Sequence, residues 1–123
     1  MRQLLDRERP LVAFLFELAS IPVDLDSIRV SPMADGGMGS LAIAPFDGRK
    51  YGWSSAECHF YDSDGVVVSA ELNLDELGVP FEIDVWKVDS SPTVAWPDQD
   101  QLHAGPPNNS FKPSPLRGLG RAP

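Results

Sequence analysis

Residues 56–72 read AECHFYDSDGVVVSAEL, two strand-like runs separated by the turn sequence DSDG. A three-residue loop over residues 63–65, with Gly65 in the left-handed conformation, fits this turn and places Asp62 opposite Val66. The same register pairs only apolar residues on one face of the hairpin: Phe60 with Val68, Cys58 with Ala70, and Ala56 with Leu72. A shift by one residue would mix polar and apolar side chains on both faces, which a half-buried sheet resists. The stretch therefore predicts an antiparallel hairpin with Cys58 in the core.

The polar side chains of this hairpin gather on its other face. Here Glu57 lies opposite Glu71, and like charges directly opposed on neighbouring strands cost a few tenths to about 1 kcal/mol. If alternate residues of the run 81–88 point inward, that run adds two carboxylates and a tryptophan to the same face. The full set, termed the acidic face, is Glu57, His59, Glu71, Glu82, Asp84 and Trp86. Because stability alone does not favour these charges, we predict that the acidic face binds a protein partner, with Trp86 as its anchor.

The rest of the chain completes an α+β fold. Asp6 is the predicted N-cap of a helix whose apolar residues recur at helical spacing through Leu18, with Pro10 in the first turn. Strands are predicted at residues 28–33, 40–44, 56–61, 66–74 and 81–88, with Pro32 marking an edge strand. The connections are too short for helical crossovers, which predicts a five-stranded, mainly antiparallel meander under the N-terminal helix. Residues 1–97 form the predicted domain, and the Pro- and Gly-rich residues 98–123 the predicted flexible, disordered C-terminal tail.

Composition narrows the function class. The chain has 10 Lys and Arg against 18 Asp and Glu, a net charge of −8, which disfavours binding to a phosphate backbone. Cys58 is the single cysteine, so the chain forms no internal disulfide and no cysteine-based zinc site. The longest apolar run is too short for a signal peptide or a membrane span. We expect a cytoplasmic protein that uses no cofactor, no metal, no nucleic acid and no membrane, with its oligomeric state open.

The stretch ADGGMGSL, residues 34–41, looks most like a functional motif. It has neither the spacing nor the lysine of a phosphate-binding loop, and a strand rather than a helix follows it. A hairpin turn with Asp35 and Gly36 at positive φ explains it better. Such a turn needs fewer than the three glycines present, so we predict that a backbone or side chain passes close to Gly37 or Gly39.

Three alternatives stay open from the residues alone. His59 could form a metal or acid–base site with the neighbouring carboxylates, whereas His103 falls in the predicted tail, where its geometry is hardly fixed. A solvated polar face with one histidine is the simpler interpretation, because chemistry is normally hosted in pockets. Trp86 could pack under residues 94–96 instead of anchoring a partner. The chain could also be a housekeeping interaction domain.

The segments MADGGMGSL (33–41), FYDSDG (60–65) and FEIDVWKVDSSP (81–92) resemble a family of small uncharacterised bacterial proteins, a domain of unknown function. The resemblance covers roughly Leu4 to Pro92 and implies an N-terminal helix followed by strands. It implies no catalytic residues. In size and charge the chain is also similar to immunity proteins that neutralise interbacterial toxins. That likeness implies a basic toxin domain as the partner.

Overall fold

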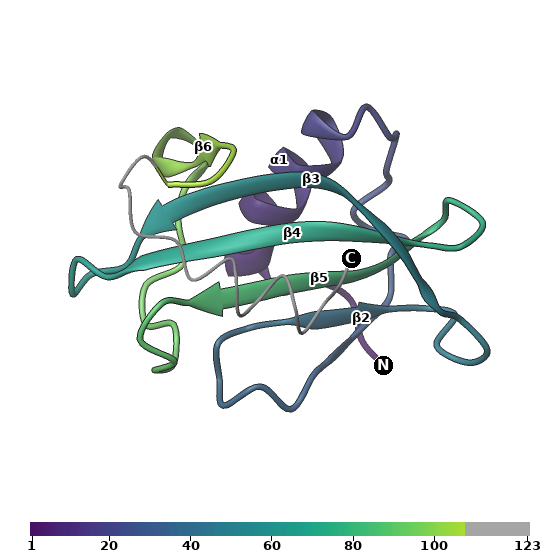
Figure 1. Ribbon diagram of the computed structural model, residues 1–123, viewed down its shortest axis with the longest axis horizontal. Coiled ribbons are helices and arrows are strands. Elements are labelled where there is room, and N and C mark those ends of the chain that lie inside the picture. Colours follow the sequence, from purple (N-terminus) through teal and green to yellow (C-terminus); the bar gives the residue numbers. More distant parts are fainter. Residues whose placement is uncertain (108–123) are drawn as a thin grey trace.

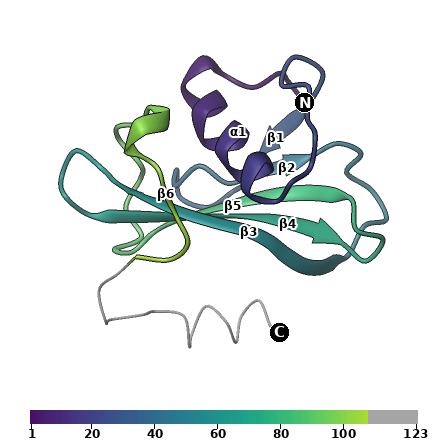
Figure 2. The same ribbon diagram turned by 90° about the horizontal axis from the view of Figure 1, so that it is seen from above.

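The computed structural model describes residues 1–107 of the chain, and these form one helix packed on one face of an antiparallel sheet (Figures 1 and 2). The elements in chain order are η1 (Asp6–Glu8), α1 (Arg9–Leu18), β1 (Val30–Pro32), β2 (Leu41–Ile43), β3 (Tyr51–Tyr61), β4 (Val67–Asp75), β5 (Pro80–Lys87), η2 (Gln99–Gln101) and β6 (His103–Ala104). The described sheet has six strands in the order β1-β2-β5-β4-β3-β6. The α+β class is confirmed, and the predicted number of five strands is wrong by one.

The strand order departs from the predicted meander. β3, β4 and β5 are consecutive neighbours, and β1 lies at the sheet edge as Pro32 indicated, but β2 pairs with β5 rather than with β3. The chain therefore crosses from one side of β5 to the far side of β4 through residues 44–50 (Figure 1). Three strand spacings measure about 14 Å, and those residues can span about 23 Å when extended. A connection too short for a helix is thus still long enough to skip two strands.

The helix forms where predicted but begins differently. α1 starts at Arg9, after the 3₁₀ turn η1, and Pro10 lies in its first turn, where a missing N–H costs little. Asp6 is not the cap of α1. Four apolar residues of α1 face the sheet and are buried: Leu11, Val12, Leu15 and Phe16. Within residues 1–107, no helix is long and apolar enough to cross a membrane.

The β3–β4 hairpin has the predicted register. Phe60 pairs with Val68, Cys58 with Ala70, Ala56 with Leu72, and Glu57 with Glu71. Gly65 has φ +81°, and the backbone N–H of Asp62 donates to the carbonyl of Val66 over 2.9 Å. The inner side chains join the core, and burial raises the pKa of the Cys58 thiol to about 12, so the thiol stays protonated at neutral pH.

The ordered fold continues past the predicted domain boundary at residue 97. β6 pairs antiparallel with β3, placing Ala104 beside Cys58 and His103 beside His59. Leu102 is buried in the core. The prediction of a flexible tail is therefore wrong for residues 98–107, because a two-residue strand and one apolar side chain leave no periodic pattern in the sequence. The remainder of the predicted tail, 108–123, lies outside the described residues.

Candidate functional site

Three carboxylates of the acidic face form one row across three neighbouring strands. Glu57 on β3 pairs with Glu71 on β4, and Glu71 pairs with Asp84 on β5. Directly paired residues on antiparallel strands have Cβ atoms about 5 Å apart, so the row is about 10 Å long. Glu71 is buried, and the two outer members are half-buried. Along each strand, the residues next to the row members belong to the core. α1 covers the core face of the sheet (Figure 2), so alternation places the row on the opposite face.

Two further rows border the three carboxylates. On one side, Trp86 on β5 pairs with Ser69 on β4, which pairs with His59 on β3. On the other side, Asn73 pairs with Glu82 and donates its side-chain N–H to the Glu82 carboxylate over 2.9 Å. The structure thus brings all six predicted residues of the acidic face together on adjacent strands. The Oδ1 atom of Asn73 is buried and accepts no hydrogen bond from residues 1–107.

His59 is turned toward β6. Its Nδ1 lies 2.8 Å from the carbonyl oxygen of Gly105, and because a carbonyl only accepts, Nδ1 is the donor and carries the proton. The ring stacks on His103 with centroids 5.1 Å apart, and Tyr61 meets it edge-on. The expectation that His103 lacks a fixed geometry is therefore wrong. Among residues 1–107, no group of three or more His, Cys, Asp or Glu is arranged to hold a metal ion.

Trp86 and Trp96 lie on different faces of the sheet. Trp86 is half-buried and sits opposite Ser69 on the acidic face. Trp96 packs against the core, and its ring lies over Gly39. Residues 94–96, which could have packed over Trp86, therefore place Trp96 on the opposite face of the sheet.

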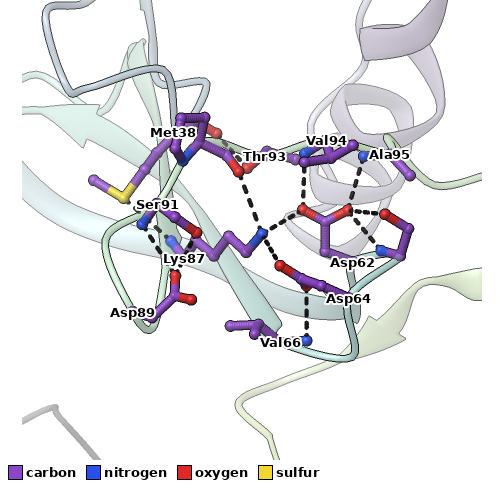
Figure 3. Close-up of polar contacts among 12 residues, drawn as sticks. Met38, Asp62, Asp64, Val66, Lys87, Asp89, Ser91, Thr93, Val94 and Ala95 are labelled. Atoms are coloured by element: carbon purple, nitrogen blue, oxygen red, sulfur yellow. Dashed lines mark hydrogen bonds and ion pairs between the residues drawn. The ribbon is translucent and has the colours of Figure 1, made fainter.

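A buried ion-pair network, which the sequence analysis missed, lies where β5 ends (Figure 3). The Lys87 ammonium is fully buried, 2.8 Å from Asp62 and 2.7 Å from Asp64, and it donates to the carbonyl of Pro92. Burial alone would raise the pKa of Asp62, but hydrogen bonds from Lys87 and from backbone N–H groups hold that pKa well below its ordinary value. The pKa of Lys87 is raised, first by its hydrogen bond to Asp62.

This network fixes the residues 92–96, termed the strap. The Asp62 carboxylate accepts the backbone N–H groups of Val94 and Ala95 at 2.8 Å each (Figure 3). Upstream in the strap, the Thr93 hydroxyl donates to the carbonyl of Met38, and its N–H donates to the carbonyl of Gly37. The turn of the β3–β4 hairpin thereby holds the strap against the glycine-rich loop at residues 34–41.

The strap explains the surplus of glycines. A Cβ on Gly37 would lie 3.2 Å from Pro92, and one on Gly39 would lie 2.6 Å from the Trp96 ring. The predicted close approach at Gly37 or Gly39 is therefore confirmed. Gly36 has the predicted positive φ, at +73°, but Asp35 does not. Asp35 instead uses its carboxylate, which accepts the backbone N–H groups of Met38, Gly39 and Ser40.

Comparison with known proteins gives a family but no function. A family model described as a domain of unknown function (DUF6984) matches residues 1–97, from the N-terminus through the strap. No curated protein and no solved structure matches the chain. Since the family model covers most of the sequence, the chain belongs to the family described as Domain of unknown function (DUF6984).

Proposed function

We propose that this chain is a non-enzymatic protein-binding module whose acidic face binds a basic partner. The in-register row of Glu57, Glu71 and Asp84 carries the proposal. The three carboxylates lie on adjacent strands, so their negative charge is concentrated on one face of the sheet. A lysine- or arginine-rich surface laid across the row would complement that charge, because each guanidinium or ammonium group can donate to two neighbouring carboxylates.

The charge of the whole described part supports the same partner. All 18 acidic residues lie within residues 1–107, together with seven of the 10 basic residues. Such a field speeds encounter with a cationic protein and disfavours acidic ones. Trp86, half-buried at the border of the row, offers the aromatic contact that typically supplies much of the binding energy once charges have aligned the partners.

The partner class that we infer is the basic domain of an interbacterial toxin. A small acidic protein that covers a basic active surface prevents that surface from reaching its own anionic substrate. The test is to express the chain with a basic toxin domain encoded beside it. Cells should survive only with the intact acidic face, and loss of protection should accompany loss of binding. No neighbouring toxin and no protection would contradict this partner class.

The binding face itself has a separate test that needs no natural partner. A decalysine peptide titrated into the ¹⁵N-labelled chain should shift the backbone amides of β3, β4 and β5 around the carboxylate row. The shifts should weaken as salt is added, because the contact is between charges near the surface. Shifts spread equally over exposed acids outside the sheet, such as Asp47, Glu76 and Asp100, would contradict a specific face.

A further inference from the structure

A pocket of about 200 Å³ lies between the N-terminal residues, the glycine-rich loop and the strap. Its lining includes Arg2, Arg7, Glu8, Asp35, Gly39 and Trp96. Drug-sized ligands occupy pockets of roughly 300–1,000 Å³, so this one suits a smaller molecule. None of the predicted acidic-face residues lines it.

Both carboxylates of the pocket are already engaged by the protein. Glu8 is buried, accepts two hydrogen bonds from the Arg2 guanidinium at 2.9 and 3.0 Å, and accepts the backbone N–H of Leu5. Asp35 accepts three backbone N–H groups of its own loop. The charges of Arg2 and Glu8 therefore neutralise each other, and the negative charge of Asp35 is stabilised by three backbone donors.

Arg7 is the lining cation that remains. Among residues 1–107, no carboxylate lies within ion-pair distance of it. Its guanidinium carbon lies 5.8 Å from the centroid of the Trp96 ring, in a cation–π contact. Trp96 in turn is held because its ring fills the space over Gly39, where a Cβ would lie 2.6 Å away. The indole thus restricts the guanidinium and leaves its N–H donors available for a bidentate anion.

We propose that this pocket binds a small ligand with one carboxylate or phosphate group and an apolar ring. Arg7 pairs with the anionic group, and the ring contacts the apolar lining from Pro32, Met33 and Trp96. This gives the glycine-rich loop a second use, since the absence of a Cβ at Gly39 seats the tryptophan that orients Arg7. The pocket shares no lining residue with the acidic face, so either proposal can fail without the other.

The test uses three probes of similar shape on the full chain. Benzoate and phenyl phosphate carry the anion, and benzyl alcohol replaces it by a neutral hydroxyl. Nuclear magnetic resonance titration should show millimolar binding of at least one anionic probe, with shifts at the Trp96 indole N–H and the Thr93 amide. Benzyl alcohol should bind at least tenfold more weakly. The two anionic probes show whether the site prefers carboxylate or phosphate.

Two variants decide whether Arg7 is responsible. Arg7→Gln should weaken binding of the anionic probe about tenfold, while the amide spectrum remains that of the folded chain. Arg9→Gln is the matched control, because Arg9 pairs with Asp26 at 3.1 Å and does not line the pocket. It should bind like the unaltered chain. No shift at the pocket, equal binding of benzyl alcohol, or unchanged binding by Arg7→Gln would each overturn the proposal.

Discussion

The Lys87 ammonium lies 2.8 Å from the Asp62 carboxylate in a pair with no solvent-exposed side-chain surface on Asp62 and almost none on Lys87. The pair joins the last residue of β5 to the residue after β3. The same carboxylate holds the strap through Val94 and Ala95. One buried charge pair therefore connects the hairpin, the strap and, through the strap, the glycine-rich loop.

Asp62→Ala should destabilise the chain strongly, because it leaves the Lys87 ammonium buried without its buried partner and leaves two backbone N–H groups of the strap without their acceptor. Breaking a buried pair from one side typically costs about 3–5 kcal/mol. Asp64→Ala is the control, since Asp64 contacts the same ammonium but its side chain is 46% exposed. This variant should lose much less unfolding free energy. Urea denaturation compares the two. Equal losses would contradict the central place of Asp62.

The Asp62 pair should also make stability depend on pH in acid. The pKa of Asp62 is lower in the folded state than in the unfolded chain, so the unfolded state binds the extra proton. The stabilisation is fully present above the unfolded pKa, about 4, and is lost as pH falls through the lower folded pKa. Denaturation midpoints measured from pH 6 to pH 2 should fall less steeply for Asp62→Asn. Parallel curves would show that other carboxylates carry the acid sensitivity.

Gly39→Ala should disturb the chain more than Gly36→Ala. Both glycines have positive φ, and a side chain in that conformation costs roughly 1–2 kcal/mol. A Cβ at position 36 meets open space, whereas one at position 39 collides with the Trp96 ring. The greater loss of unfolding free energy expected for Gly39→Ala combines this collision with the larger backbone strain of a side chain at φ +117°, compared with +73° at Gly36. If the two variants lose equal stability, the strap does not pack as described.

Residues beyond the predicted domain boundary should contribute to stability. Leu102→Ala removes a side chain that is 7% exposed in the core, and such truncations cost about 2–5 kcal/mol. Val94→Ala, at a position 70% exposed in the strap, is the comparison and should change little. Thermal unfolding measures both. A Leu102 variant as stable as the Val94 variant would place residues 98–107 outside the cooperative unit.

The sequence predicts best where two local signals agree. In the β3–β4 hairpin, the turn residues and the alternation of apolar side chains specify the same register, and the observed pairs match it. The pairing of β2 with β5 leaves no such signal, because it joins Leu41 to Ile83 across two other strands. The predicted meander assumes that strands consecutive in sequence are neighbours in the sheet. That assumption fails at residues 44–50, which connect β2 to β3 past two other strands.

The alternation of side chains also predicts which residues share the acidic face. The same alternation could have predicted the buried ion-pair network. Alternation that points Ile83 and Val85 inward also points Lys87 inward, toward the acidic turn at Asp62 and Asp64. A lysine at a core position beside two aspartates is a signal for a buried ion pair. The pocket had no comparable signal, because Arg7, Gly39 and Trp96 meet only through tertiary packing.

The role of the acidic face is tested most directly by two double variants of equal charge. Glu57→Gln with Asp84→Asn removes two carboxylates from the row, and Asp47→Asn with Glu76→Gln removes two from exposed loops. The dissociation constant for decalysine, measured by titration calorimetry at low salt, should rise about tenfold for the first pair, or roughly 1.4 kcal/mol. It should change by less than about twofold for the second. Equal weakening by both pairs would mean that net charge alone attracts the peptide, and would contradict a binding face on β3, β4 and β5.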